Sequence, residues 1–293
     1  MEGEEIMIEA IHQWLHDRRP DSWVQRRQFQ LNFGRPLRVK DPQTFNEKLH
    51  WLMRNDRRSV LTQCADKLAV HDYVRDRVGA SYLPKLYGDW VDPDTIDFST
   101  MPSRYVLKTT HGSGQNILVP DSSRLDEYEA RKQLASWLTR SNYWLWRERA
   151  YKDIPPRVMA EEWLGELEQS PPDYKFFCFN GTPRIIQLDT NRFTQHNGEY
   201  FDLDWDLLPF TITYKRPSKP SPRPAHLDEM LHVAQSLSHG HPFVRVDLYD
   251  LPSRVVFGEM TWYPGGASEH FTPESWDLTL GSWLTLPSLE DAR

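Results

Sequence analysis

The chain has 293 residues, of which 39% are hydrophobic, which is enough for one large core or two smaller ones. Its 35 basic and 42 acidic residues give a net charge of -7, and no basic tract is long enough to follow a nucleic-acid backbone. No apolar run approaches the roughly 20 residues that cross a bilayer, and the acidic, amphipathic N-terminus lacks the order of a signal peptide. Composition therefore excludes a nucleic-acid partner and a transmembrane segment, and favours a globular cytoplasmic protein.

Helical patterns dominate the first third of the chain. Apolar residues recur at helical spacing within residues 1–19, and a second helix is expected after Thr44, because Glu47 follows three positions later in a capping-box pattern. A third helix is expected from Asp66 to Gly79, with the glycine placed to form a left-handed C-terminal cap. We expect these helices to act as a scaffold.

Short apolar and β-branched segments follow from residue 83 onward. We expect strands at 105–109, 116–119, 157–161, 174–179, 183–189, 243–249 and 254–260. Two helical patterns, at 124–140 and 225–240, interrupt these strands, and the proline-rich stretch 213–226 is expected to be a surface loop. Strands joined by short turns and interrupted by single helices predict an α+β fold with antiparallel sheets. The two cysteines, Cys64 and Cys178, lie far apart and are expected to be core thiols, without a disulfide or zinc site.

The segment YVLKTTHGSGQNILV places Lys108 in one predicted strand and a glycine-rich turn before the next. A five-residue turn with two glycines is an ordinary hairpin loop. The same turn can also hold phosphate, because glycines leave backbone N–H groups accessible to phosphate oxygens. The pattern by itself leaves both interpretations open.

The run Glu161, Glu162, Trp163 and Leu164 follows a predicted strand. It is either a strand end that leaves the core, or a hinge whose backbone and carboxylate bind an adenine edge while an apolar side chain packs on the ring.

Two residues of the next strand, Asp173 and Lys175, share one face, and this strand is expected to turn back at Asn180 and Gly181. A carboxylate beside an ammonium group suits a ribose hydroxyl next to a phosphate. An exposed ion pair is the alternative.

Charged residues also alternate in the last two predicted strands. Arg245 and Asp247 share a face of one strand, and Glu259 and Thr261 share a face of the other, before a turn at Pro264–Gly266. Asp247 and Glu259 on neighbouring strands would form a pair of hard oxygen donors, the ligand type that Mg²⁺ prefers when phosphates complete its shell.

Several nucleotide-binding and catalytic motifs do not occur in the sequence. The chain has no G-x-x-x-x-G-K-[ST] P-loop, no H-R-D or D-F-G of protein kinases, and no G-x-S-x-G elbow. The remaining residues follow one another in the order found in the ATP-grasp superfamily. This order reads Lys67, Lys108 with His111–Gly114, Glu161–Leu164, Asp173, Arg245-x-Asp247, and Glu259 with Pro264 and Gly265. From about Phe45 to about Leu286, phrases such as FNEKLHWL, VLKTTHGSGQNI and GEMTWYPGG closely resemble the TupA-like ATP-grasp proteins, named for teichuronopeptide biosynthesis.

The resemblance implies that two α+β lobes with antiparallel sheets clamp ATP. It implies a helical region over 1–65, an N-lobe with the glycine-rich lid over 66–163, and a C-lobe with the metal site over 164–293. ATP would contact the two lysines, the lid, the hinge and the acidic and basic residues after it. These positions are Lys67, Lys108, His111, Gly112, Ser113, Gly114, Glu161, Glu162, Trp163, Leu164, Asp173 and Lys175. Magnesium would be held by Asp247 and Glu259, with a weaker donor at Thr261, where many ATP-grasp ligases carry asparagine.

The activity that the resemblance implies is an ATP- and Mg²⁺-dependent carboxylate–amine ligase that works through an acylphosphate. Arg245, Lys175 and Arg192 would be its catalytic residues, and His111 is an acid or base candidate or a turn residue without a role. The partners would be a small-molecule or saccharide carboxylate, for which family association suggests a uronic acid of a cell-surface polysaccharide or its precursor, and an amine donor. We expect alanine at Lys108 or Asp247 to abolish activity and leave the fold intact.

Two alternatives remain open. An ATP-grasp phosphotransferase would use the same nucleotide site and stop after phosphoryl transfer. A glycosyltransferase or a non-catalytic component of polysaccharide assembly would use the D-x-D pair Asp202 and Asp204, although such a pair in an aromatic loop is usually structural. The sequence leaves the oligomeric state open.

Overall fold

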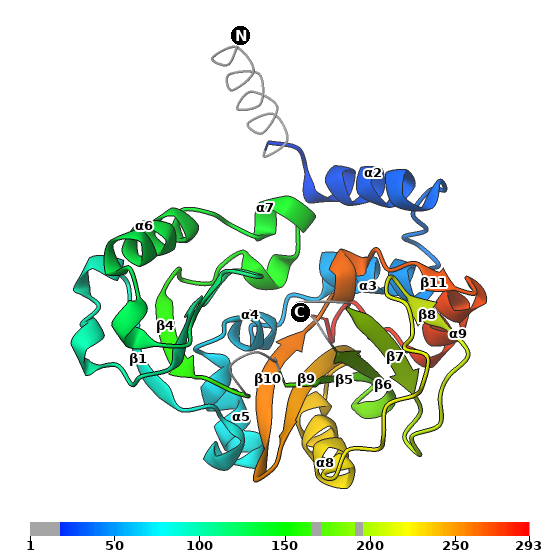
Figure 1. The fold of residues 1–293 in the computed structure, drawn as a ribbon. Helices are drawn as coiled ribbons and strands as arrows, with labels where there is room; N and C mark the ends of the chain where they lie inside the picture. The colour runs from blue at the N-terminus through cyan, green and yellow to red at the C-terminus, as the bar shows by residue number, and fades with distance from the viewer. Residues whose placement is uncertain (1–17, 166–170, 191–195, 293) are drawn as a thin grey trace.

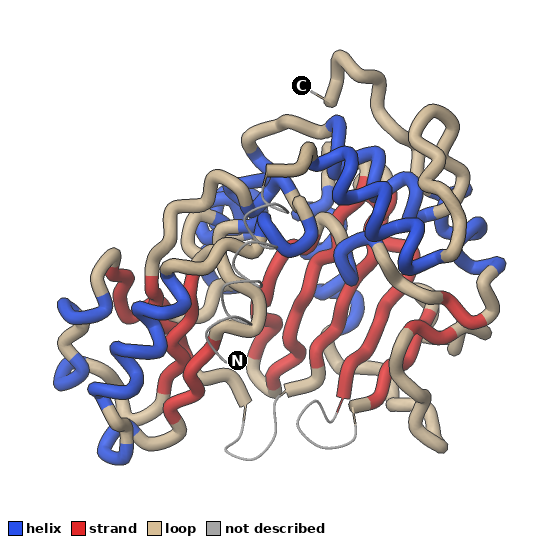
Figure 2. The backbone as a smooth tube through the Cα atoms, turned by 90° about the horizontal axis from the view of Figure 1, so that it is seen from above, coloured by secondary structure: helices blue, strands red, loops and turns tan. Residues whose placement is uncertain are grey.

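The computed structural model describes residues 18–165, 171–190 and 196–292, and builds them around two antiparallel sheets that lie side by side (Figure 2). The smaller sheet has the strand order β1 (Leu86–Trp90), β4 (Val158–Glu162), β2 (Tyr105–Thr109), β3 (Asn116–Val119). The larger has the order β10 (Arg254–Thr261), β9 (Phe243–Leu251), β5 (Asp173–Phe179), β6 (Thr182–Thr190), β7 (Asn197–Phe201). A two-stranded sheet pairs β11 (Phe271–Thr272) with β8 (Thr211–Ile212). This arrangement is the α+β fold with antiparallel sheets that the sequence predicts.

Helices surround these sheets and also fill the space between them. They are α2 (Asp21–Phe33), α3 (Phe45–Asn55), α4 (Val60–Ala65), α5 (Val70–Val78), α6 (Glu127–Leu138), α7 (Tyr143–Trp146), α8 (Leu227–Ser238) and α9 (Ser275–Trp283). In Figure 1, α6 accompanies the smaller sheet, α8 lies against the larger one, and α4 and α5 lie between the two. None of the described helices combines the length and the apolar character that crossing a bilayer requires.

Each sheet has its own buried core. The smaller core joins β2 and β4 to α6, and includes Tyr105, Leu107 and Leu134. The larger core joins α3, α4, α5 and α8 to the second sheet, and both cysteines lie in it as buried free thiols. Because α4 and α5 pack into the larger core and lie between the two sheets, the residues between these helices and the smaller sheet lie where the two halves meet.

The predicted helices are confirmed in part. The capping box at the start of α3 is present, since Thr44 Oγ1 accepts from the Glu47 N–H at 3.3 Å and Glu47 Oε2 accepts from the Thr44 N–H at 3.2 Å. The third helix begins at Val70, four residues later than expected, because the Asp66 carboxylate accepts the N–H groups of the next turn. Gly79 has φ 104° and ψ 158°, so the left-handed helical cap expected there is wrong. The helix predicted at 1–19 lies almost wholly outside the described residues.

All seven predicted strands occur, with ends within two residues of those expected. Asn180 and Gly181 have φ 51° and 78°, as a two-residue hairpin turn requires. The sequence patterns missed β1, an edge strand whose residues stay half-exposed, and β7, which carries the polar Asn197 and Glu199. The proline-rich stretch 213–226 contains no helix or sheet strand.

Candidate functional site

The strands β9 and β10 carry the two carboxylates predicted to bind metal. Their register shifts between Phe257 and Glu259, so a β-bulge at Gly258 places Glu259 directly opposite Asp247. Residues directly opposite each other in antiparallel strands point to the same face of the sheet. Without the bulge, Glu259 would lie opposite Val246 and point to the other face. The bulge therefore creates the carboxylate pair.

Gly258 has no room for a side chain. A Cβ at this position would lie 3.0 Å from the backbone oxygen of Asp247 and 3.1 Å from the ring of Tyr249. We expect Gly258→Ala to lower the free energy of unfolding by about 1–3 kcal/mol, because overpacking forces the bulge to shift. Urea unfolding measures this change. A variant with the stability and the ATP affinity of the wild type would show that the bulge accepts a side chain.

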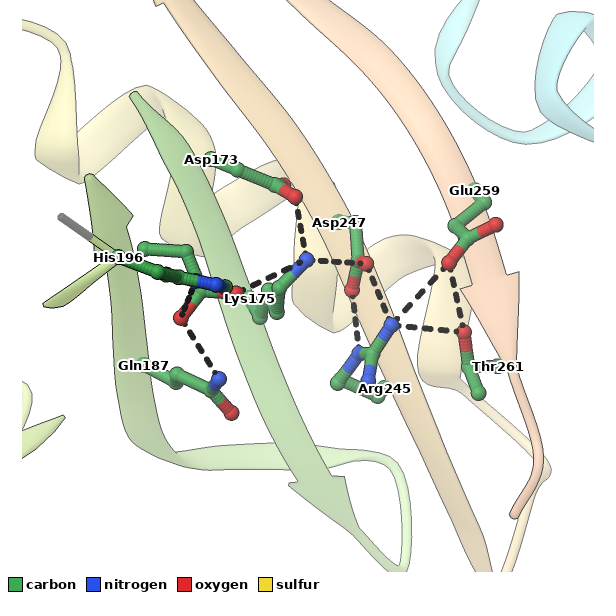
Figure 3. A network of polar contacts seen from close by, with 9 residues as sticks. Asp173, Lys175, Gln187, His196, Arg245, Asp247, Glu259 and Thr261 are labelled. Carbon is green, nitrogen blue, oxygen red and sulfur yellow. Dashed lines mark hydrogen bonds and ion pairs between the residues drawn. The ribbon is translucent and has the colours of Figure 1, made fainter. Parts of the chain in front are cut away.

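Arg245 ties the carboxylate pair together (Figure 3). Its Nε donates to Asp247 Oδ1 at 2.7 Å, and its Nη2 donates to Asp247 Oδ2 at 2.6 Å and to Glu259 Oε1 at 3.1 Å. The same Nη2 donates to the Thr261 hydroxyl at 3.0 Å, and that hydroxyl donates to Glu259 at 3.2 Å. The Arg-x-Asp and Glu-x-Thr patterns thus meet on one face of the larger sheet.

Lys175 on β5 extends this network across the sheet. Its Nζ forms an ion pair with Asp173, and lies 3.1 Å from Asp247 Oδ2 and 3.6 Å from Asp189 Oδ2. Asp173 and Lys175 are buried, so the alternative of an exposed ion pair is wrong. Sequence reasoning missed Asp189, because the turn at residues 180–181 alone would place Leu188 opposite Asp173, and only the register shift between Phe177 and Cys178 brings Asp189 there.

The network carries an excess of negative charge. Four carboxylates, from Asp173, Asp189, Asp247 and Glu259, face two cations, Lys175 and Arg245, which leaves two negative charges among these six residues. Within the described residues, no group of three or more metal-ligating side chains is preassembled. Two adjacent carboxylates with a surplus of two negative charges fit a divalent cation whose remaining ligands are phosphate oxygens and water.

Charge compensation keeps Glu259 and Lys175 ionised. Burial raises the pKa of Glu259, but the positive charges of Arg245 and Lys67 outweigh it and hold that pKa at about 2. Burial lowers the pKa of Lys175, whereas Asp247 and Asp173 raise it more, to above its usual value. At neutral pH Glu259 is therefore a carboxylate, which is the state that a metal ligand needs.

Lys108, the strand lysine predicted to bind phosphate, belongs to a buried ionic group in the smaller sheet. Its Nζ donates to Glu161 Oε2 at 2.5 Å, and the other oxygen of Glu161 lies 3.1 Å from His71 Nε2. Glu161 is 3% exposed, so this carboxylate faces its two partners and not solvent. The sequence patterns did not single out His71, whose partner comes from a strand 90 residues further along the chain.

The Glu161 carboxyl makes stability depend on pH. Burial raises its pKa, but Lys108 and His71 outweigh this effect and lower it to about 2, from an ordinary value of 4.5. Because the folded-state pKa is depressed, the stabilisation is present above the unfolded-state value and is lost as the pH falls from 4.5 towards 2. A shift of this size corresponds to about 3 kcal/mol. We expect Glu161→Gln to flatten the decline of unfolding free energy over this window, measured by urea unfolding at each pH; an unchanged decline would contradict the pairing.

The rest of the predicted hinge lies at the edge of the smaller sheet. Glu162 Oε2 accepts from the Lys85 N–H at 3.0 Å and from Arg254 Nη2 of the larger sheet at 2.7 Å, so this side chain bridges the two sheets. Trp163 Nε1 is buried without a hydrogen-bond partner in the described part of the chain, and Leu164 is half-buried. A buried, unpartnered N–H group is available to a ligand.

The glycine-rich turn is a hairpin tip between β2 and β3. Ser113 and Gly114 are exposed, and Gly114 has φ 68°, a backbone conformation that favours glycine. Lys67 Nζ donates to the Gly112 carbonyl at 2.5 Å, and the Lys67 N–H donates to the Thr110 carbonyl at 3.1 Å. These bonds connect the predicted lid to the turn before α5.

His111 points away from the exposed tip. It is 4% exposed, and its Nε2 lies 2.9 Å from the Arg140 carbonyl. Burial lowers the pKa of this imidazole. A neutral, backbone-bonded histidine stabilises the base of the hairpin, and this geometry favours the structural interpretation over acid or base catalysis.

Lys67 also lies between the two halves. It lines a small cavity of about 10 Å³ with Glu259, Tyr151 and Gly258. Burial lowers the pKa of Lys67, Glu259 raises it, and the nearby Lys108 lowers it further. Lys67 therefore lies close to both the carboxylate pair and the other predicted phosphate lysine, and the phosphates of a nucleotide would have to displace it from this narrow space.

One predicted group, the D-x-D pair, does not join this constellation, and another, Arg192, lies outside the described residues. In the D-x-D pair, Asp202 Oδ1 accepts the N–H of Asp204 at 3.0 Å and the N–H of Asp206 at 2.8 Å. The Asp202 carboxylate therefore stabilises its own loop, which weakens the case for a nucleotide-sugar metal there.

Comparisons with solved structures give low overall similarity. D-alanine–D-alanine ligase from Bacillus anthracis is 16% identical with a TM-score of 0.40, covering 69% of this chain and 58% of that one. D-alanine–D-alanine ligase from Helicobacter pylori is 12% identical with a TM-score of 0.41, covering 82% and 69%. The ATP-grasp ligase PsnB, complexed with minimal precursor, Mg and ADP, is 12% identical with a TM-score of 0.41, covering 85% and 66%. The chain spans about 55% of the length of the first solved structures that it matches.

The sequence comparison is more direct. No curated protein matches the chain. The sequence model of TupA-like ATP-grasp proteins matches residues 47–285, a span that contains both sheets and every described residue of the constellation. Because this match extends over most of the 293 residues, the chain belongs to the TupA-like ATP-grasp family.

Proposed function

We propose that the protein is an ATP- and Mg²⁺-dependent ligase that joins a carboxylate to an amine through an acylphosphate. The observation that carries the proposal is the position of Lys67, which lines one cavity with Glu259 and bonds to the lid carbonyl of Gly112. A lysine between a glycine-rich hairpin and a carboxylate pair can neutralise phosphate oxygens while a metal ion neutralises the others. Family membership supports the use of ATP.

The proposed nucleotide contacts follow from the geometry. Lys67 and Lys108 would bind phosphates, the exposed tip at Ser113 and Gly114 would cover them, and Trp163 Nε1 would donate to the base. Asp247 and Glu259 would hold Mg²⁺, which supplies charge neutralisation at the phosphates. Since Arg245 occupies both carboxylates, metal binding requires its guanidinium group to turn towards the reacting atoms.

The proposed reaction has two steps. An oxygen of the substrate carboxylate attacks the γ-phosphorus, and the bond from this phosphorus to the β-phosphate oxygen breaks to release ADP. The amine nitrogen then attacks the carbonyl carbon, the carbon–oxygen bond to phosphate breaks, and the amine gives up a proton to solvent. Arg245 would stabilise the oxyanion of the tetrahedral intermediate, and loss of such a contact raises the barrier by roughly 3 kcal/mol.

We also propose the substrate class. The carboxylate would be a uronic acid of a cell-surface polysaccharide or its precursor, and the nucleophile an amino acid or another amine, because TupA-like proteins are named for teichuronopeptide biosynthesis. Dependence on ATP and Mg²⁺ fits a reaction in the cytoplasm that serves cell-envelope synthesis.

Hydroxylamine trapping tests the proposal. The protein is incubated with ATP, Mg²⁺ and a panel of uronic acids, with and without hydroxylamine. A hydroxamate formed only when ATP and the acid are both present supports an acylphosphate. A stable phosphorylated product would favour a phosphotransferase instead, and the absence of ATP binding at millimolar concentration would reject both.

A further inference from the structure

A second, larger cavity is also lined by residues of α4. Its volume is about 390 Å³, within the range of small-molecule sites, and its lining includes Arg57, Arg58, Thr62, Arg149 and Asp153. These residues come from the loop before α4, from α4 itself and from the 3₁₀ turn Arg149–Tyr151 with the residues after it. Asp56 also lines the pocket, so three arginines face two aspartates, and the surplus of one positive charge favours an anionic ligand.

Only one of the three arginines is neutralised by a close partner. Arg58 forms a two-point ion pair with Asp56, with Nε–Oδ1 2.9 Å and Nη2–Oδ2 2.6 Å. Arg57 and Arg149 make no ion pair within the described part of the chain, and Arg57 is exposed. Burial and the charge of Arg149 lower the pKa of Arg57, while Tyr263 and the more distant charge of Asp21 raise it. Two guanidinium groups that repel each other are stabilised when an anion binds between them.

Two short elements connect this pocket to the carboxylate pair. The 3₁₀ turn places Arg149 in the pocket and Tyr151, two residues later, in the cavity with Lys67 and Glu259. The helix α4 lines the arginine pocket with Thr62 and Gln63 and the cavity of Lys67 with the next residue, Cys64. Its Leu61 carbonyl accepts from Trp262 Nε1, next to Thr261, at 2.9 Å. The arginine pocket is therefore adjacent to the cavity that Lys67 and Glu259 line.

We propose that Arg57 and Arg149 bind a second anionic group of the carboxylate substrate, a phosphate or a carboxylate, in the pocket next to the proposed reaction centre. This inference rests on the proposed function, and it defines the substrate class more narrowly. A phosphate would belong to a phosphorylated or nucleotide-linked uronic acid. A carboxylate would belong to a neighbouring uronic acid of a polymer. Planar guanidinium groups bind both in two-point geometry.

The test measures binding of inorganic phosphate and of acetate, each titrated calorimetrically into the protein saturated with AMPPNP and Mg²⁺. The saturated nucleotide site leaves the arginine pocket for the probes. We expect wild-type protein to bind at least one probe at millimolar concentration, and Arg57→Gln and Arg149→Gln to weaken it about tenfold or more. Tighter binding of phosphate would indicate a phosphorylated precursor, and tighter binding of acetate would indicate a polyuronate.

The control is Arg124→Gln in a pocket of about 560 Å³ on the smaller sheet, where Arg104 and Arg124 have Asp121 and Asp126 beside them. We expect this variant to keep the wild-type probe affinity. Unchanged probe affinity in both pocket variants, or no binding of either probe by wild type, would overturn the inference. AMPPNP titration of each variant separates the two proposals. Failure to bind AMPPNP counts against the proposed ligase. Normal AMPPNP affinity together with unchanged probe affinity counts only against the proposed role of the arginine pocket.

Discussion

Glu259→Gln is expected to reduce ATP-dependent turnover roughly a hundredfold or more, because the substitution removes one of two carboxylates from the proposed magnesium site. The side chain is 44% exposed and the two residues have the same shape, so the fold should persist. The amide oxygen can still accept from Thr261 and Arg245, which keeps the packing of the network. Release of ADP at several Mg²⁺ concentrations measures the loss, and we expect a higher Mg²⁺ requirement in the variant.

Glu290→Gln is the matched control, since Glu290 is exposed near the end of α9 and outside the network. Its turnover and Mg²⁺ requirement should equal those of wild type. Near-normal turnover of Glu259→Gln with an unchanged Mg²⁺ requirement would remove Glu259 from the metal site.

The second large effect is on stability. Arg245→Met is expected to lower the free energy of unfolding by about 3–5 kcal/mol, because it leaves Asp247 buried with Lys175 as its remaining cation. The side chain of Asp247 is 3% exposed, so water does not replace the lost guanidinium. Urea unfolding at neutral pH measures this change.

Arg254→Met on the neighbouring strand serves as the comparison. Arg254 pairs with Glu162, but its side chain is 36% exposed, and surface pairs contribute about 0–1 kcal/mol. An equal loss of unfolding free energy in Arg245→Met and Arg254→Met would mean that burial does not make the Arg245–Asp247 pair stronger than the Arg254–Glu162 pair. That result would contradict our account of the network.

The burial of this network also changes an expectation from the sequence. Alanine at Asp247 removes the anion between Arg245 and Lys175, so the variant should lose stability as well as activity. Alanine at Lys108 likewise leaves the buried Glu161 with His71 alone. Isosteric Glu259→Gln is therefore the cleaner test of catalysis.

The sequence by itself determined much of the local structure. Alternation of apolar and polar residues located β2, β5, β9 and β10, because the period of two is set by the pleat of each strand. The same alternation assigned Asp173 with Lys175, and Arg245 with Asp247, to common faces, and the capping box located the start of α3. Lys67 was harder to place, because the helical pattern of the sequence includes this residue. In the structure Asp66 accepts the Leu68 N–H, and α5 begins only at Val70, so Lys67 lies in the turn before the helix.

Only the tertiary structure decided which faces meet. The bulge at Gly258 places Glu259 beside Asp247, and a bulge depends on pairing with a partner strand, which no local pattern specifies. Glu161 faces Lys108 and His71 because three segments far apart in the chain pack together, and the resulting burial makes an isolated charge too costly. The arginine pocket arises in the same way, from the loop before α4 and the 3₁₀ turn at Arg149. These segments are separated by some 90 residues of the chain and become neighbours only when both pack into the larger core.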